Sequence, residues 1–266
     1  MQETVLLETQ HLRKAFGGLV AVDDVNVAVR QGSMHSIIGP NGAGKTTFFN
    51  LLTGNHFPTS GTILFKGADI TRLPLHRRAH LGIGRSFQIT NIFSNLSVLE
   101  NVRLAAQALG KDNYRLFRRA DSLAKYVERA HAVIDLVGLT KETMLPATVL
   151  PHGAKRKLEL AILLAADPEL LLLDEPTAGM ASEQVPELIQ TIDRIRRIAG
   201  KTIVMVEHNM SVVMGISDRI TVMNQGKLLA EGTPTEIAAN KTVQSVYLGE
   251  LYGDLNEAAS GGHHGE

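Results

Sequence analysis

Three apolar stretches mark the buried strands of a predicted core. They are residues 34–38, the four consecutive leucines at 170–173, and residues 201–206. Apolar runs that do not alternate with polar residues are typical of strands buried on both faces, as in a parallel sheet covered by helices. Polar or glycine residues follow each run. The pattern therefore predicts an α/β fold whose parallel strands carry polar groups at their carboxyl ends.

Alternating patterns predict a second, antiparallel set of strands. Residues 4–9 read as a short strand, and residues 20–29 alternate valine with polar positions in a way that suits its partner. A further strand is expected at residues 62–66. Residues 220–223 and 227–230 flank Asn224-Gln-Gly226, which indicates a hairpin.

A helical pattern separates the first of these strands from the later ones. After a basic stretch at 75–88, apolar residues recur at helical spacing from Ser97 to Val137, and Gly138 stops the run. Ser97 to Glu100 fits a capping box. We expect a helical lobe at about 90–160, inserted into a core made of about 1–89 and 161–235. The charges around residues 110–113 read as a solvated linker within the lobe.

The end of the chain is predicted to be a helix followed by a tail. Thr233 to Glu236 opens a helix that we expect to span about 234–250, and residues 251–266 are glycine-rich and predicted to be disordered. His263 and His264 in this tail could bind a metal ion. Solvated histidines are the simpler interpretation of the pair.

Composition narrows the classes of protein that remain. The 266 residues are 44% apolar, have a formal net charge of zero and include no cysteine. Disulfides and cysteine-ligated metals are therefore excluded, and no overall charge attracts nucleic acid or anionic lipid. No signal peptide is evident, and no uncharged apolar stretch reaches the ~18 residues that a membrane span needs. Any membrane role is expected to be peripheral.

The strongest local motif follows the first buried strand. Residues 39–46 fit G-x-x-x-x-G-K-[ST], with Gly39, Gly44, Lys45 and Thr46 at the fixed positions. Backbone N–H groups of such a loop, and the start of the helix after it, bind phosphate. Lys45 would contact the β- and γ-phosphates, and Thr46 would hold Mg²⁺. The alternative is an ordinary glycine-rich turn, which the strand and helix on either side argue against.

Polar residues at the other strand ends supply what hydrolysis needs. Asp174 and Glu175 follow the four leucines, so Asp174 would hold Mg²⁺ through water and Glu175 would accept the proton of the attacking water. His208 follows the next strand and could orient that water. Gln88, after a third candidate strand, could join Mg²⁺ or water. Taken alone, His208 reads more simply as structural, and Gln88 would mean little.

Taken together, these residues resemble the ATP-binding cassette (ABC) ATPases. In that resemblance the Walker A motif is Gly39–Thr46, the Q-loop glutamine is Gln88, and the Walker B motif ends at Asp174 before Glu175. The switch histidine is His208, and the signature motif lies at Leu150–Arg156. The resemblance covers about residues 5–250. It implies a P-loop NTPase core with an antiparallel β subdomain and an inserted helical lobe, which binds ATP with Mg²⁺.

The resemblance also implies which residues contact the nucleotide. An aromatic at the place of Phe16 stacks on adenine in this family. The residues implied in ATP binding are Phe16, Gly39, Pro40, Asn41, Gly42, Ala43, Gly44, Lys45, Thr46, Thr47, Pro151, His152 and Gly153. Those implied in catalysis are Lys45, Gln88, Glu175 and His208, and those implied in Mg²⁺ binding are Thr46, Gln88 and Asp174.

The signature motif departs from the usual Leu-Ser-Gly-Gly-Gln. Pro151 replaces the serine that contacts the γ-phosphate of the opposite subunit, His152 replaces a glycine, and Ala154 replaces the glutamine, whereas Gly153 is retained. Proline is tolerated at the first position of a helix, so the helix start can still face the phosphate. One hydrogen bond, worth roughly 1.5–3 kcal/mol at most, is lost. Lys155 could compensate or could be an ordinary surface lysine.

The loop after the Walker B motif also departs from the family pattern. Residues 178–181 are Ala-Gly-Met-Ala where Ser-Ala-Leu-Asp is common, so an aspartate that couples the two sites is missing. These residues, with 155–159, 214–220 and 246–250, look like the first ATPase of branched-chain (hydrophobic) amino acid importers. Relatives of that group serve urea or short amides.

The resemblance to that group implies partners and a location. A second ABC ATPase, identical or similar, would complete a dimer. Two transmembrane permease subunits and a periplasmic or extracellular solute-binding protein would complete the transporter, with no nucleic acid. The chain would lie peripherally on the cytoplasmic face of the inner (plasma) membrane. Ile92, Phe93 and Leu96, within about 89–101, are either exposed for a permease or part of the lobe core.

Other readings of the same motifs stay open at this point. An ABC ATPase of lipopolysaccharide export or Fe–S assembly would carry the same core motifs. DNA-repair and translation cassettes fit less well, because the chain lacks a long coiled-coil insertion and a second cassette. A regulatory module that binds nucleotide without hydrolysing it is a third possibility.

Overall fold

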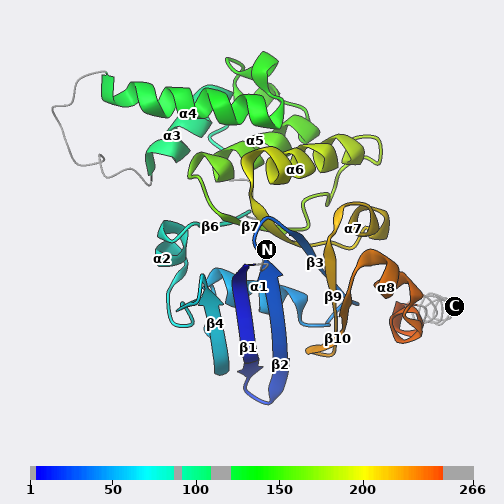
Figure 1. Ribbon diagram of the computed structural model, residues 1–266. Coiled ribbons are helices and arrows are strands. Elements are labelled where there is room, and N and C mark those ends of the chain that lie inside the picture. Colours follow the sequence, from blue (N-terminus) through cyan, green and yellow to red (C-terminus); the bar gives the residue numbers. More distant parts are fainter. Residues whose placement is uncertain (1–3, 87–91, 109–120, 248–266) are drawn as a thin grey trace, which may run out of the picture.

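The computed structural model describes the chain except for residues 1–3, 87–91, 109–120 and 248–266. A six-stranded sheet lies at its centre, in the order β10-β9-β3-β8-β7-β6 (Figure 1). Its strands are β3 (Met34–Ile38), β6 (Ile83–Arg85), β7 (Leu170–Asp174), β8 (Thr202–Val206), β9 (Arg219–Asn224) and β10 (Lys227–Gly232). β6, β7, β8, β3 and β9 pair in parallel, and β10 pairs antiparallel with β9. The predicted parallel strands and the hairpin are therefore confirmed.

A second, antiparallel sheet has the order β2-β1-β4-β5. Its strands are β1 (Val5–Phe16), β2 (Leu19–Arg30), β4 (Ser60–Phe65) and β5 (Ala68–Asp69). The expectation that the first strand ends at residue 9 is wrong. β1 continues through register shifts against β2, with His11 in the left-handed region at a φ of 50°. Such irregularities let a strand bend without ending.

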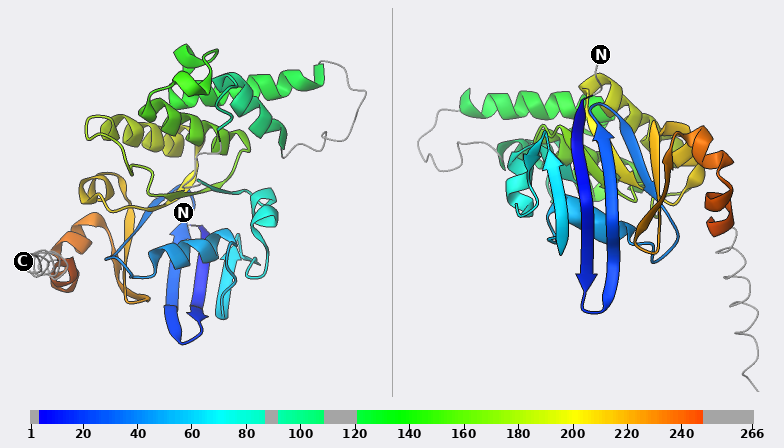
Figure 2. Two further views of the ribbon diagram at one scale, coloured as in Figure 1. Left: turned by 180° about the vertical axis from the view of Figure 1, so that it is seen from behind. Right: turned by 60° about the horizontal axis from the view of Figure 1, so that its bottom comes forward.

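Helix α1 (Lys45–Thr53) packs between the two sheets (Figures 1 and 2). Its Phe48, Phe49, Leu51 and Leu52 are buried in one core with residues of both sheets. The phosphate-binding motif at the start of α1 is thus attached to a helix that is enclosed over most of its length. Its position relative to the parallel strands is fixed by packing.

A buried arginine holds the far end of α1. Arg78, in α2 (Leu75–His80), is fully buried. Its guanidinium donates hydrogen bonds to the carbonyls of Leu51, Leu52, Ile70, Thr71 and Leu73. Burial lowers the pKa of Arg78 to about 10, so the group is still a cation at neutral pH. A cation at a helix C-terminus binds the last carbonyls, which lack partners within the helix.

The helices α3 (Val98–Ala108), α4 (Asp121–Val137), α5 (His152–Ala165) and α6 (Val185–Ala199) form a separate layer above the parallel sheet (Figure 1). Short turns, η1 (Thr140–Glu142) and η2 (Ala147–Val149), precede α5. The expected lobe boundary at about residue 160 falls inside α5. Of the predicted capping box, the structure shows the Ser97 hydroxyl accepting from the Glu100 N–H, while the Glu100 carboxylate accepts from Arg103.

Of the residues considered for a permease contact, one is exposed at the surface and another packs against the core. Phe93 is 61% exposed. Ile92 packs against the core of the lobe and the parallel sheet. The expected linker at 110–113 lies outside the described residues.

The C-terminal part does not form the single helix expected at 234–250. α7 (Met210–Ile216) precedes the hairpin, and α8 (Pro234–Ala239) follows it with a complete capping box between Thr233 and Glu236. The chain leaves the helical conformation at Asn240 and is helical again over residues 241–247. The Asn240 side chain accepts from the N–H groups of Thr242 and Val243 and so starts the second helix. His263 and His264 lie outside the described residues.

Among the helices that the structure describes, none combines the length and the apolar character that crossing a bilayer requires.

Candidate nucleotide-binding and hydrolysis site

The phosphate-binding loop has two positions that only glycine can fill. Gly39 has a φ of 153°, and a Cβ there would lie 2.2 Å from the carbonyl oxygen of Met223. Gly44 has a φ of 95°, and a Cβ there would lie 2.3 Å from the carbonyl oxygen of Ala21. Both contacts are far below any tolerated separation. The loop is therefore held closely between β2 and the β9–β10 hairpin, where Gly226 donates its N–H to the Ala43 carbonyl.

A hollow of about 540 Å³ lies over this loop. Its walls come from residues 41–47 and 19–21, from Gln225 and Gly226, and from Glu175 and His208. Lys45 is 5% exposed, and its ammonium donates to the carbonyls of Gly39 at 2.6 Å and Pro40 at 2.8 Å. Backbone N–H groups, a helix start and a lysine around one hollow suit a polyphosphate.

Asp174 ends β7 beside this hollow with its carboxylate largely enclosed. An Arg85 nitrogen lies 3.4 Å from Asp174 Oδ2, and the Asp174 N–H donates to the Ser86 hydroxyl. Burial raises the pKa of the Asp174 carboxyl, the Arg85 charge opposes this shift, and the Glu175 charge adds to it. A bound cation would offset the cost of that buried charge. The oxygens of Asp174 and Thr46 are the ligand type that Mg²⁺ prefers, so these residues would hold the ion that neutralises nucleotide phosphates.

Glu175 and His208 meet at the edge of the same hollow. The His208 ring nitrogen Nε2 lies 3.0 Å from Glu175 Oε1, at hydrogen-bonding distance. Glu175 has a φ of 46°, and its N–H donates to the Val206 carbonyl of β8. Both side chains remain partly exposed. A carboxylate and an imidazole held together at a phosphate site can activate and orient a water molecule.

The β1–β2 hairpin lies on one side of the hollow, which Leu19, Val20 and Ala21 line. Phe16 is 45% exposed at the end of β1, and its ring makes a T-shaped contact with the ring of His56 at a centroid distance of 5.6 Å. The Lys14 ammonium lies 4.8 Å from the centre of the Phe16 ring. Stacking of adenine on Phe16 stays a prediction. His56, which the sequence reasoning missed, belongs to a loop whose place beside Phe16 no local pattern indicates.

The signature segment differs from its expected geometry at one residue. Pro151 was expected at the first helical position, but it is the N-cap of α5, with φ −64° and ψ 162°, and the helix begins at His152. This geometry is extended, which suits a residue that precedes a helix. No side chain caps α5, so the early N–H groups, including that of Gly153, are available at an exposed helix start. α5 lies in the helical layer and α1 between the sheets (Figure 1). The phosphate-binding loop and the signature segment thus lie in different parts of the fold.

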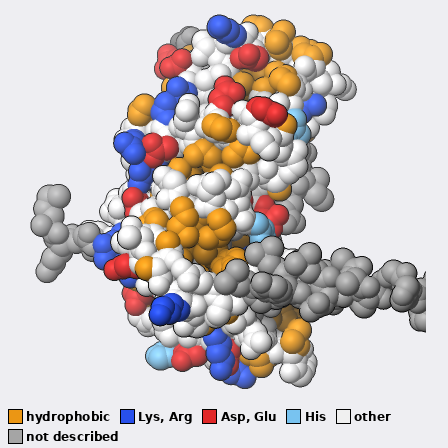
Figure 3. All heavy atoms as spheres, turned by 90° about the vertical axis from the view of Figure 1, so that its right-hand side faces the viewer, with side chains coloured by type: hydrophobic (Ala, Val, Ile, Leu, Met, Phe, Trp, Pro, Cys, Tyr) orange, Lys and Arg blue, Asp and Glu red, His pale blue; other side chains and the backbone are white. Residues whose placement is uncertain are grey.

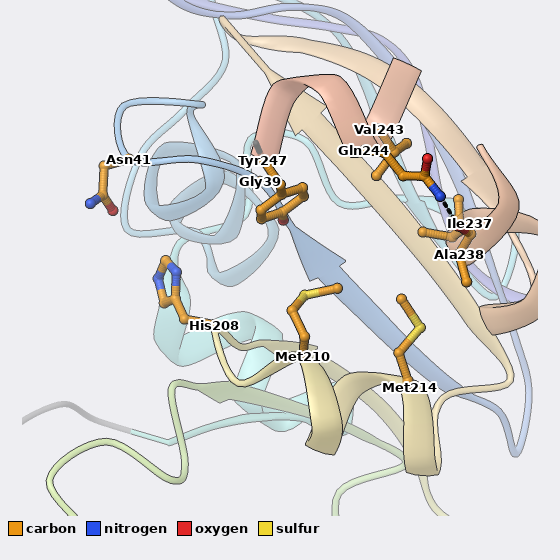
Figure 4. Close-up of a pocket in the computed structure, with 10 residues that line it drawn as sticks. All are labelled: Gly39, Asn41, His208, Met210, Met214, Ile237, Ala238, Val243, Gln244 and Tyr247. Carbon is orange, nitrogen blue, oxygen red and sulfur yellow. Dashed lines mark hydrogen bonds between the residues drawn. The ribbon is translucent and has the colours of Figure 1, made fainter. Parts of the chain in front are cut away.

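A groove of about 500 Å³ runs from the phosphate loop toward the C-terminus (Figure 4). Met210 and Met214 of α7 point into it, opposite Ile237 of α8 and the side chains of Val243 and Tyr247. His208 and Asn41 lie at its end nearest the phosphate loop. Hydrophobic side chains gather on this face of the molecule (Figure 3). The groove was not predicted, because its walls come from segments far apart in the chain.

The structure brings Lys45, Thr46, Glu175 and His208 around one hollow and places Asp174 beside it. Gln88 lies outside the described residues. Two further residues of the site were not singled out from the sequence, namely Arg85 and Glu207. The signal for Glu207 was available, because a charged residue directly follows the apolar run of β8.

A loop that binds phosphate before a buried helix, and a carboxylate and imidazole beside it, define a P-loop nucleotide hydrolase. Comparison with known proteins narrows this class. A family model described as ABC transporter matches residues 22–178, and a model described as branched-chain amino acid ATP-binding cassette transporter matches residues 227–252. The chain therefore belongs to the ATP-binding cassette transporter family, which confirms the resemblance inferred from its motifs.

Individual relatives agree with this assignment. The high-affinity branched-chain amino acid transport ATP-binding protein LivG of Salmonella typhimurium is 42% identical over 252 residues, which is 92% of this chain and 98% of LivG. The lipopolysaccharide export system ATP-binding protein LptB of Escherichia coli is 36% identical, over 92% of this chain and 97% of LptB. A crystal structure of an ABC transporter cassette in its ADP conformation matches with a TM-score of 0.81 and 27% identity, over 92% of this chain and 99% of the other. The chain is thus an ATP-hydrolysing subunit of the ABC type.

Proposed function

We propose that this chain powers the import of branched-chain amino acids, or of a related small polar solute such as urea or a short amide. The observation that carries the proposal is the match of residues 227–252 to the branched-chain amino acid cassette model. This segment lies outside the shared ATPase motifs, so it distinguishes one transporter group from another. The 42% identity to LivG supports the same group.

The proposed working form is a dimer of cassettes, with an identical or a similar second ATPase. Each ATP, with Mg²⁺ on Thr46, Asp174 and Gln88, would lie between the phosphate loop of one subunit and the helix start at Pro151–Gly153 of the other. Glu175 would act as the general base and His208 would orient the attacking water. Lys45 would bind the β- and γ-phosphates.

The proposed transport step is a conformational cycle. ATP closes the dimer, and hydrolysis opens it again. Two transmembrane permeases would follow this motion through contacts with the helical lobe, where Phe93 is exposed. A periplasmic or extracellular protein would deliver the solute. The chain itself would lie peripherally on the cytoplasmic face of the membrane.

Transport of radiolabelled leucine tests this proposal. Cells that carry the chain together with the permeases and the solute-binding protein of a branched-chain amino acid importer should take up leucine, and Glu175→Gln should abolish the uptake. Glu8→Gln is the matched control, since Glu8 is a carboxylate on the distant β1 strand and contacts Gln10. Uptake that is unchanged in Glu175→Gln would show that this chain does not drive it.

Lipopolysaccharide export is the second candidate, because LptB matches nearly the whole chain. Purification from membranes distinguishes the two functions. Import requires two multi-spanning permeases and a solute-binding protein to purify with the chain, whereas components of lipopolysaccharide export would contradict import.

A further inference from the structure

Glu207 is a buried carboxylate to which the proposed hydrolytic steps assign no role. It follows β8 directly and is 3% exposed. Glu207 Oε1 accepts hydrogen bonds from the Thr177 N–H at 3.0 Å and the Thr177 hydroxyl at 2.5 Å. Oε2 accepts from the N–H groups of His208 at 2.9 Å and Asn209 at 3.2 Å.

The four donors satisfy both oxygens of this buried carboxylate. An ionised carboxylate only accepts hydrogen bonds, and here each of its oxygens faces two donors. Hydrogen bonds to a charged acceptor are shorter and stronger than neutral ones. No other side-chain type of this size offers two acceptor oxygens that match two pairs of donors. Glutamine would turn its amide toward one pair and leave those donors without an acceptor.

This carboxylate joins the two loops that carry the hydrolytic residues. Thr177 lies two residues after Glu175 on the loop that follows β7, and His208 lies on the loop that follows β8. His208 Nε2 and Glu175 Oε1 lie 3.0 Å apart at the edge of the hollow. A Glu207 side chain that fixes both loops therefore fixes the separation of these two groups.

Further hydrogen bonds connect these two loops to α7 and to α5. Asn209 accepts from the N–H groups of Ser211 and Val212, so the start of α7 is held together with the His208 loop. On the other side, Arg156 of α5 donates to the Ala178 carbonyl next to Thr177. Contacts of this kind link the start of α5 to the loops around Glu175 and His208 within a single chain.

We propose that Glu207 is a positioning residue for ATP hydrolysis. It does not touch the nucleotide. It holds His208 and the Thr177 loop so that His208 and Glu175 stay at hydrogen-bonding distance. The hydrogen bond from Arg156 to the Ala178 carbonyl connects the same loop to α5. The proposal concerns ATP turnover by the chain, so it stands independently of which solute is transported.

Steady-state ATPase measurements on the full-length protein test the proposal. In Glu207→Gln we expect kcat to fall about 10- to 100-fold, because two charge-assisted bonds are lost where the reacting groups are held. We expect the KM for ATP to change less than about twofold, since the phosphate loop keeps its contacts. A fall in kcat with an unchanged KM is the result that supports positioning.

Thr9→Val is the matched control for a purely structural effect. Thr9 is 2% exposed, and its hydroxyl donates to Val25 and accepts from Val27, away from the hollow. This variant should lower the melting temperature and keep the kcat of the wild type. If Thr9→Val and Glu207→Gln lose kcat equally, or if Glu207→Gln keeps the wild-type kcat, the proposal is overturned.

Variants of Thr177 keep the proposal testable if Glu207→Gln does not fold. Thr177→Val removes one donor to Glu207, and Thr177→Ser retains it. We expect a few-fold lower kcat in the valine variant and recovery in the serine variant. Equal turnover in both would contradict the proposal.

Discussion

Two regions of the molecule, the phosphate-binding half (Gly39 to the end of α1) and the signature half (Pro151 and the start of α5), differ in how completely they are built. The phosphate-binding half has every residue of its motif, two glycines that the packing requires, and a helix whose far end is held by the buried Arg78. The signature half begins at Pro151, which caps α5 with no side-chain hydrogen bond, and its first residues are exposed. The phosphate-binding half therefore has all its motif residues and is enclosed by packing, whereas the signature half lacks usual motif residues and is exposed.

Under the proposed dimer, this difference would separate the interactions that the chain makes by itself from those that need a second subunit. A phosphate loop must be preformed, because its N–H groups bind only when they point to one place. In the dimer that we propose, the start of α5 would gain its contacts only when the two subunits close, so its sequence could vary with a smaller effect on the free chain. The predictions below test this contrast, beginning with the largest expected effect.

Glu175→Gln should lower ATP turnover about 10²- to 10⁴-fold, the usual contribution of a general base. ATP binding should be retained, because the phosphate loop is unchanged. Steady-state ATPase and nucleotide-binding measurements check both parts. If the wild type and the variant turn over ATP equally slowly, Glu175 is not the base.

Lys45→Ala should lower turnover about 100- to 1,000-fold, because a charge aimed at the transferring phosphate is lost. Lys155→Ala is the control on the signature half, and we expect its turnover to stay within about twofold of the wild type. A large loss in Lys155→Ala would show that the signature half depends on this lysine. Normal turnover in Lys45→Ala would contradict the assignment of residues 39–46 as the phosphate-binding motif.

Arg78→Met should destabilise the fold by about 4 kcal/mol, because carbonyls at the end of α1 lose a buried cation. Arg77→Met is the matched control on the same helix, where the side chain is exposed, and should change stability by less than about 0.5 kcal/mol. Urea unfolding measures both values. Similar stabilities for the two variants would mean that Arg78 does not hold α1.

Pro151→Ser should tighten ATP-dependent dimerisation about tenfold by restoring a hydroxyl at the signature position. The serine could instead cap α5, which would raise the melting temperature without changing the dimer. Analytical ultracentrifugation in the non-hydrolysing Glu175→Gln background separates the two results. Pro151→Ala removes the proline ring without adding a hydroxyl, and equal dimerisation in both variants would contradict the prediction.

Asp174→Asn should slightly stabilise the nucleotide-free chain at pH 7. The pKa of Asp174 is raised in the folded chain, so the folded state binds this proton more tightly than the unfolded state does. Ionisation therefore costs stability as the pH rises past the ordinary value of 3.8 toward the folded pKa, and asparagine removes that cost. Thermal melts at pH 3.5 and pH 7 should show a gain only at the higher pH. An equal gain in melting temperature at both pH values would show that the stabilisation comes from packing and not from removal of the charge.

The sequence was sufficient for much of this protein because its signals are local. The phosphate loop needs glycine, lysine and threonine at fixed spacing, and a strand buried on both faces needs an unbroken apolar run such as 170–173. Both features can be seen without knowing what packs against them. The parallel strands, the hairpin at 224–226 and the family all follow from such patterns.

Only the tertiary structure determined what depends on segments that meet from far apart. Arg78 lies in a basic run that resembles a solvated surface, and its burial depends on α1, which lies far from it in the sequence. Glu207 became significant when folding placed it against Thr177. Packing and hydrogen bonds across the chain, which no sequence period encodes, determined the roles of these two residues.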